Sequence, residues 1–208
     1  MELQPQKYYT PQEYLALEEK ATYKSEYFGG QIFPMGDFEG DTPEAMARAK
    51  PAHNAIRENM SGEFYGHFKK KKTCRSYSSD QRVLMPSNGL YTYPDLVVVC
   101  GKSEFENDSL LNPVLIVEVL SKSTAHYDRS EKFELYRDIP SFTEYLLIDS
   151  RRIYVELHRK NQEGLWVLES ELRSLSDAVE LQSIGLSLSL EEMYANTEGL
   201  PKVMFSIR

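Results

Sequence analysis

The segment at residues 112–123, NPVLIVEVLSKS, places a carboxylate inside an apolar run. Glu118 interrupts a stretch of Val, Leu and Ile that is typical of a strand buried on both faces. An ionised carboxylate is tolerated in such a place when it is paired, hydrogen-bonded or bound to a metal ion. The sequence therefore predicts a partner for Glu118.

A second carboxylate, Asp95, lies in the strand YPDLVVVC that precedes Glu118 along the chain. About a dozen residues without helical periodicity connect the two segments, so we expect antiparallel neighbouring strands. If Cys100 lies opposite Pro113, Asp95 falls directly across from Glu118, with Cβ atoms about 5 Å apart. Two carboxylates at that separation repel by about 3 kcal/mol at an effective dielectric of about 20. A shared proton or a divalent cation would offset this repulsion.

The helix predicted in STAHYDRSEKFELYRDI supplies a positive charge. Its apolar stripe contains Leu135, Tyr136 and Ile139, and Asp128 and Lys132 continue that stripe toward the N-terminus of the helix. A lysine therefore stands where a core residue is expected. Because about five or six residues separate the preceding strand from this helix, the lysine should reach the end of the strand.

Ordinary explanations remain open for each of these residues. Glu118 could accept a hydrogen bond from a backbone amide at a strand end, and Asp95 could be a turn residue after Pro94. Asp128 and Lys132 could form a simple helix pair four residues apart, worth a few tenths of a kcal/mol.

The segments YPDLVVVC, PVLIVEVLSKST and YDRSEKFELYRDIPSFTEYLLID together resemble the Uma-type "putative restriction endonuclease" family of the PD-(D/E)XK nuclease superfamily. The resemblance covers about residues 10–195. It implies an α+β (α/β-like) fold like that of restriction endonucleases, with a mixed central β-sheet flanked by helices. It also implies hydrolysis of phosphodiester bonds in DNA, with Mg²⁺ as the cofactor and Mn²⁺ as its substitute.

The resemblance assigns the motif acids to Asp95 and Glu118. The motif lysine is absent from its usual position, where Leu120 stands, so its role passes to the helix residue Lys132. Lys122 is the rival candidate, because it would share the face of Glu118 if the strand continued.

Further residues extend this expected site. Glu26 resembles another acidic position near the N-terminus of the family, although it could also be a solvent-facing strand residue. Tyr136 should pack against the site or hydrogen-bond to it, unless it is simply a core aromatic. The Val119 carbonyl is a candidate backbone ligand of the metal, and His53 lies on a predicted helix that can approach the site.

Composition sets the size and charge of the domain. The 208 residues are 41% apolar and 12% aromatic, which is enough for one sizeable core. We expect a single nuclease-like domain over 1–208, with an N-terminal helix and hairpin at about 1–40 and a nuclease core at about 41–195. The net charge of −8 weakly opposes broad nucleic-acid binding but leaves room for a local basic groove.

The elements that must position these residues follow from periodicity, caps and turn residues. Helices are expected at about 10–20, from Asp41 or Thr42 to about 70 with a break or new start at Pro51, at 123–139 and at 190–195. Strands are expected on both sides of Gly29 and Gly30, at about 73–86, 93–100, 113–120, 143–149 and 152–160, near Trp166, and at 184–190.

The cysteine usage and the N-terminus concern the cellular compartment. Cys74 and Cys100 lie far apart in sequence, and MELQPQKYYT has neither a basic start nor an apolar stretch. No window approaches the roughly 20 apolar residues that span a bilayer. We therefore expect a soluble, reduced, cytoplasmic protein without a membrane partner.

Three classes of function compete at this point. The leading one is a Mg²⁺-dependent DNA endonuclease, and the alternative is a non-catalytic DNA- or protein-binding module on a nuclease scaffold. The third is a hydrolase of another phosphate-containing substrate. Cleavage of two DNA strands suits a homodimer, whose interface the apolar strands near 145–157 could build, although they could equally be core.

Overall fold

The computed structural model describes residues 7–35, 51–197 and 199–200. The predicted helix start at Asp41 or Thr42 lies outside these residues. The helix that follows is described from Pro51 onward as α3 (Pro51–Lys71).

The N-terminal segment folds as its caps and glycines predict. In α1 (Pro11–Glu18), Thr10 and Glu13 form a reciprocal capping box, with Pro11 in the first turn. Strands β1 (Ser25–Phe28) and β2 (Gln31–Pro34) pair as an antiparallel hairpin. Its two-residue turn has φ of 58° at Gly29 and 82° at Gly30, the left-handed conformation that glycine adopts without steric cost.

The central sheet has six strands in the order β12-β11-β10-β9-β6-β3. In chain order these are β3 (Cys74–Ser78), β6 (Leu96–Cys100), β9 (Leu115–Leu120), β10 (Glu144–Asp149), β11 (Val155–Lys160) and β12 (Trp166–Leu172). Strands β9 and β10 are parallel, whereas the other neighbours are antiparallel. The expected mixed sheet is confirmed.

The pairing of β6 with β9 has the predicted register. Leu96 lies opposite Val117, and Val98 lies opposite Leu115. Continuing this register by one residue places the position before Leu96 opposite Glu118. The strand arrangement that the two carboxylates require is therefore present.

The remaining strands are short, and the sequence predicted only some of them. A second six-stranded sheet, in the order β2-β1-β5-β4-β8-β7, contains β4 (Val83–Met85), β5 (Leu90–Thr92), β7 (Phe105–Glu106) and β8 (Ser109–Leu110). Strands β13 (Ala178–Leu181) and β14 (Leu186–Ser189) form a separate hairpin before α6 (Leu190–Met193). Strands β4 and β14 lie within the strands predicted at about 73–86 and 184–190. The other four were not predicted, because strands of two to four residues are too short to show a period-2 pattern.

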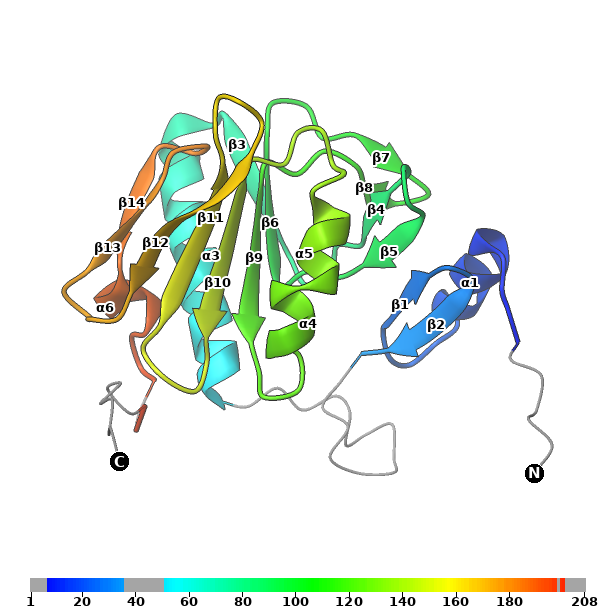
Figure 1. Cartoon of the computed structure of the whole chain (residues 1–208), viewed down its shortest axis with the longest axis horizontal. Helices are drawn as coiled ribbons and strands as arrows, with labels where there is room; N and C mark the ends of the chain where they lie inside the picture. Colours follow the sequence, from blue (N-terminus) through cyan, green and yellow to red (C-terminus); the bar gives the residue numbers. More distant parts are fainter. Residues whose placement is uncertain (1–6, 36–50, 198, 201–208) are drawn as a thin grey trace.

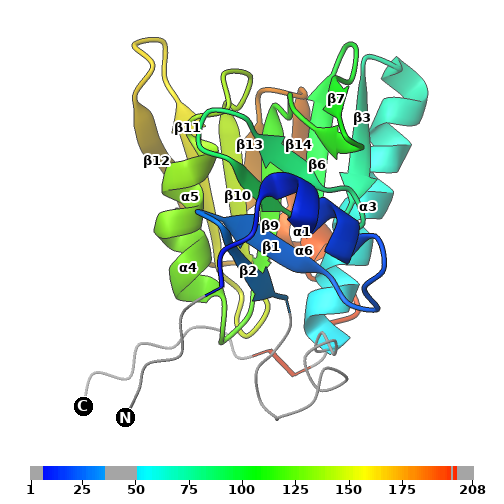
Figure 2. The same cartoon turned by 90° about the vertical axis from the view of Figure 1, so that its right-hand side faces the viewer.

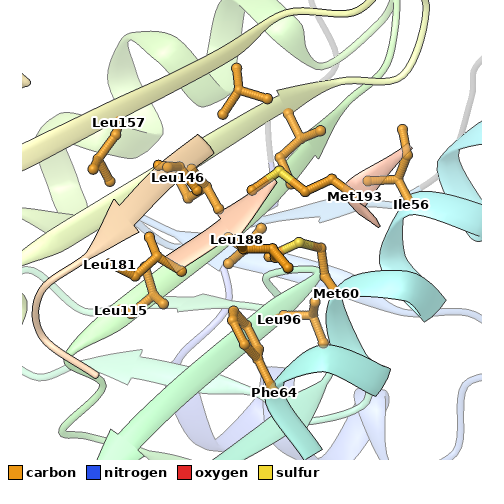
Figure 3. Packing of buried hydrophobic residues seen from close by; sticks show 14 of the residues in the cluster. Ile56, Met60, Phe64, Leu96, Leu115, Leu146, Leu157, Leu181, Leu188 and Met193 are labelled. Atoms are coloured by element: carbon orange, nitrogen blue, oxygen red, sulfur yellow. The ribbon is translucent and has the colours of Figure 1, made fainter. Parts of the chain in front are cut away.

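Helices cover both faces of the central sheet. Figures 1 and 2 show α3 on one side, with α4 (Ala125–Arg129) and α5 (Glu131–Tyr136) on the other. Helix α3 buries residues spaced four apart, Ile56, Met60, Phe64 and Phe68. They pack with leucines of the sheet and of the β13–β14 hairpin (Figure 3).

The alternation of side chains along β9 decides where its acid points. Val117 and Val119 belong to the core under α3, whereas Ile116 and Leu120 belong to the core under α4 and α5. Glu118 alternates with the valines, so its side chain points toward α4 and α5. All six residues of β9 are buried, as the apolar run predicted.

The single helix predicted at 123–139 is wrong, because the segment divides into α4 and α5 at Ser130. Ser130 has φ −116° and ψ −98°, and its hydroxyl donates to the His126 carbonyl at 2.6 Å. This side-chain bond competes with the helical backbone bonds. Asp128 and Lys132 nevertheless stay on one side, with 3.6 Å between Oδ1 and Nζ.

The expectation that both cysteines are reduced is also wrong in this structure. Cys74 and Cys100 lie opposite each other on β3 and β6 and form a disulfide. Only the register of these two strands brings the sulfurs together, so sequence spacing gave no signal. Among the described residues, no helix has the length and apolar character needed to cross a bilayer. A cytoplasmic location stays a prediction.

The apolar strands near 145–157 are core rather than an exposed interface. Every residue of β10 is buried, and β10 lies between β9 and β11 in the sheet. The first residues of β11, from Val155 to Leu157, are buried as well. Any self-association must therefore use other surfaces.

An ion pair between Arg129 and Glu156 joins α4 to β11, with Nε 2.9 Å from Oε1. Burial opposes ionisation of Glu156, but hydrogen bonds from His158 and Arg129 lower its pKa from 4.5 to about 2. The stabilisation that this carboxylate contributes is present above its unfolded pKa and is lost as the pH falls through the folded one. The pair therefore opposes acid unfolding.

We expect Glu156→Gln to destabilise the fold by about 1–3 kcal/mol at neutral pH, because a charged hydrogen-bonded partner of Arg129 is lost. The difference from the unmodified protein should shrink as the pH falls toward about 2. Urea unfolding across this pH range measures it, with Glu163→Gln, at an exposed glutamate, as the matched control. A difference that is constant with pH would contradict this role.

Candidate active site

One buried ammonium group lies at the centre of a cluster of acids. The Nζ atom of Lys132 is 3.0 Å from Glu118 Oε1, 3.0 Å from Glu26 Oε1 and 3.6 Å from Asp128 Oδ1. All four residues are at most 6% exposed. Three carboxylates thus share one ammonium group away from bulk water.

The carboxylates of Asp95 and Glu118 each accept a hydrogen bond from a main-chain amide of the neighbouring strand segment. The Asp95 amide donates to Glu118 Oε2 at 3.2 Å, and the Val119 amide donates to Asp95 Oδ2 at 2.8 Å. His53, on α3, places Nε2 3.3 Å from the same Asp95 oxygen. The two carboxylates therefore lie side by side at the junction of β6 and β9.

Glu26 reaches the cluster through the N-terminal hairpin. Strand β1 pairs with β5 at Tyr27 and Tyr91, and Tyr14 on α1 donates from its hydroxyl to the Ser25 carbonyl at 2.6 Å. Tyr14 stacks on Tyr27, with ring centroids 5.1 Å apart. Figure 2 shows α1 and β1 in front of the central strands. This aromatic packing turns Glu26 inward.

One side-chain hydrogen bond to Glu26 and one to Glu118 hold these two carboxylates in position. The Thr92 hydroxyl on β5 donates to Glu26 Oε1, and the Tyr136 hydroxyl on α5 donates to Glu118 Oε1 at 2.8 Å. Tyr145 on β10 donates to the Asp128 carbonyl at 3.0 Å and so anchors α4 to the sheet. Side chains from several elements therefore hold the site in one arrangement.

The electrostatics of the cluster follow from burial and the excess of acids. Burial raises the pKa of Glu118 to about 8; Lys132 opposes this rise, and Asp128 and Asp95 add to it. Burial likewise raises the pKa of Asp128. Burial disfavours the charge of Lys132, but Glu118 and Glu26 attract it and raise its pKa well above the ordinary value. Lys132 therefore keeps its proton at neutral pH. The surrounding acids outnumber this one positive charge, so a second cation would be attracted to them.

The structure brings together most of the residues that the sequence singled out. Asp95, Glu118, Lys132, Glu26 and Tyr136 meet through the contacts given above. Lys122 does not share this environment, because it is exposed in the turn between β9 and α4.

Three contributions were missed or underrated by sequence reasoning. Asp128 was placed on the apolar stripe but was not assigned to the site, because an ordinary helix pair with Lys132 remained open. His53 was noted without a partner, and its contact with Asp95 depends on how α3 packs against the sheet. Thr92 gave no signal, because it lies in the short strand β5.

The donor set at the strand junction fits a small hard cation. Asp95 and Glu118 offer carboxylate oxygens, and the Val119 carbonyl points to the same side of β9 as the Val119 amide that binds Asp95. Within the described part of the chain, no three His, Cys, Asp or Glu side chains are arranged to hold a metal ion. Mg²⁺ keeps several waters and uses one or two carboxylates, so two acids and a carbonyl suit it.

Comparison with known proteins gives consistent matches. The model of the family described as "Uma2: Putative restriction endonuclease" matches residues 11–191. Two uncharacterised proteins of Synechocystis are similar in sequence. The first, slr1290, is 35% identical over 186 residues, covering 89% of this chain and 90% of that protein. The second, sll1609, is 36% identical over 162 residues, covering 76% and 85%.

A solved structure shares the fold. The crystal structure of "a putative nuclease belonging to DUF820" from Anabaena variabilis has a TM-score of 0.67 and 19% sequence identity. The similarity covers 88% of this chain and 96% of that one. At this identity the likeness establishes the fold alone.

We expect Lys132→Met to destabilise the protein by about 3–5 kcal/mol, because the buried acids lose their shared cation. Lys122→Met is the matched control and should lower the stability by much less, since that lysine is exposed. Urea unfolding of both variants without divalent metal measures the difference. Equal stability of the two variants would contradict a buried, charge-compensating Lys132.

Proposed function

The chain belongs to the Uma2 family, described as "Putative restriction endonuclease", and from this premise we propose that it is a Mg²⁺-dependent endonuclease that hydrolyses phosphodiester bonds in DNA. The observation that carries the proposal is the convergence of two strand carboxylates with a buried lysine. Asp95 lies beside Glu118, and Lys132 contacts Glu118 at 3.0 Å. Hard anionic ligands can hold a metal ion that activates water, and a fixed cation can stabilise the charge that develops on a phosphodiester during hydrolysis.

Asp95, Glu118 and the Val119 carbonyl would hold the Mg²⁺, with Mn²⁺ as a substitute. When bound, such an ion lowers the pKa of water and neutralises charge on the phosphate. The main chain keeps both carboxylates in place, through the Asp95 amide and the Val119 amide. His53 Nε2, 3.3 Å from Asp95 Oδ2, helps to orient that carboxylate.

Lys132 would stabilise the scissile phosphate oxygens or orient the attacking water. Glu26 and Glu118 keep its side chain as an ammonium, which favours charge stabilisation over acceptance of a proton. Tyr136 fixes the Glu118 oxygen that faces Lys132. Glu26 and Asp128 thus act as positioning residues for the lysine.

The alternative function is a non-catalytic DNA- or protein-binding module on the same scaffold. It is favoured by the reciprocal bonds of Asp95 and Glu118, which satisfy both carboxylates through the main chain. The net charge of −8 favours the protein-binding form of this module, because DNA-binding surfaces are usually basic. A hydrolase of another phosphate-containing substrate would use the same residues as the endonuclease. We propose a homodimer for the endonuclease, since two active sites suit two strands.

We expect Asp95→Asn and Lys132→Ala each to lower Mg²⁺-dependent cleavage of duplex DNA by at least about 10²-fold, because each removes a charge that acts on the reacting phosphate. Lys122→Ala tests the rival lysine and should cleave like the unmodified protein. Single-turnover rates on a labelled duplex measure all three. Cleavage that survives Asp95→Asn, or that is lost with Lys122→Ala, would overturn the assignment.

Metal binding separates the enzyme from the module. We expect calorimetry to show Mn²⁺ binding that Glu118→Gln weakens by about 10-fold or more, because one of the two carboxylate ligands becomes neutral. Glu134→Gln, at an exposed glutamate of α5, is the matched control. An unmodified protein that binds no Mn²⁺ would favour the non-catalytic module.

A further inference from the structure

Three arginines from separate elements surround one tyrosine ring. The guanidinium carbons of Arg152, Arg173 and Arg129 lie 4.5, 5.1 and 6.0 Å from the centroid of Tyr154. The Tyr154 residue is only 7% exposed. Arg129 comes from α4, Arg152 from the β10–β11 turn and Arg173 from the end of β12. We call these four residues the Tyr154 arginine cluster.

Carboxylates hold these arginines in place. Arg152 Nε donates to Asp149 at 3.0 Å, Arg129 Nε donates to Glu156 at 2.9 Å, and Arg173 lies 3.6 Å from Glu171. The side chains of Arg152 and Arg173 are 42% and 41% exposed, whereas that of Arg129 is 28% exposed. Carboxylates therefore orient the guanidinium groups of Arg152 and Arg173 on side chains that remain partly in contact with solvent.

The cluster lies at the same end of the sheet as the proposed active site. Asp149 pairs with Leu120, two residues beyond Glu118 on β9. In the sheet, Leu147 lies between Glu118 and Glu156, the partner of Arg129. Two strand spacings amount to about 10 Å. In Figure 1, the β10–β11 turn and α4 lie together at the lower end of the molecule.

This spacing matches the repeat of a nucleic-acid backbone. Phosphates follow one another at about 3.4 Å of axial rise on each strand, so about three nucleotides span 10 Å. Arginine forks match phosphate oxygens and stack on aromatic rings, which limits the entropy lost on binding. A strand whose scissile phosphate lies at the metal site proposed for Asp95 and Glu118 would thus extend its neighbouring phosphates over the arginines.

We propose that the Tyr154 arginine cluster binds backbone phosphates of a DNA duplex beside the site of cleavage. The proposal rests on the proposed function, since it takes DNA as the substrate. It also explains how a chain with a net charge of −8 can hold a polyanion. Three of its acids surround Lys132, while these arginines, each held by a carboxylate, lie at the edge of the site.

The test is the salt dependence of DNA binding, measured by fluorescence anisotropy on a short labelled duplex with EDTA present. We expect Arg152→Gln/Arg173→Gln to bind more weakly than the unmodified protein. The slope of log K against log salt should fall by about 0.9 for each lost phosphate contact, so by about 2 for the pair. Arg173→Gln alone, with a loss of about 0.9, keeps the test usable if the double variant unfolds.

The matched control removes the same charge elsewhere. Lys69→Gln/Lys70→Gln changes two exposed lysines in the last turn of α3 and should leave the slope unchanged. Arg152→Lys/Arg173→Lys should keep most of the slope, because the positive charges remain. Thermal unfolding checks that each variant is folded.

The outcomes separate this proposal from the nuclease assignment. Equal slope losses in the arginine and lysine variants, or no binding by the unmodified protein, would overturn the arginine proposal even if Mg²⁺-dependent cleavage occurs. An arginine-dependent slope without any cleavage would support the proposal and would reject the endonuclease function. Cleavage is therefore assayed separately, with Mg²⁺ added.

Discussion

The contact of the Lys132 ammonium group with three buried carboxylates is the constraint on which the rest of the site depends. Charges removed from water are tolerated only when they are paired and hydrogen-bonded. Glu118, Glu26 and Asp128 come from β9, β1 and α4, so satisfying one lysine requires all these elements to dock together. The site and the packing of the N-terminal hairpin are therefore parts of one electrostatic arrangement.

The central sheet supplies the second half of this arrangement. An antiparallel neighbour at β9 places Asp95 beside Glu118, and the backbone amides at the junction hold both side chains. Two acids are unfavourable beside a buried apolar strand. Residues that are locally unfavourable, but whose cost the surrounding structure offsets, are characteristic of functional sites.

Charge is distributed unevenly over this end of the molecule. Three acids surround the single ammonium group of Lys132 at the sheet junction, whereas at the adjoining β10–β11 turn the guanidinium groups around Tyr154 are each paired with one carboxylate. The net charge of −8 describes the sum and conceals this separation. A phosphate-containing polymer would meet anionic metal ligands at one point and arginines at the next.

The sequence by itself determined which face of each element carries its apolar residues, because periodicity and alternation are local properties. The buried run around Glu118 and the stripe through Lys132 and Tyr136 followed from it. The register of the Asp95 and Glu118 strands was assumed from the sequence, and the sheet has that register. Only the tertiary structure decided the contacts made by docking. It places Glu26 through the packing of Tyr14, Tyr27 and Tyr91, and it joins Cys74 to Cys100. It also divides the helix at Ser130 and buries Lys132, whereas Lys122 is exposed. These outcomes depend on residues far apart in sequence whose contact no local pattern encodes.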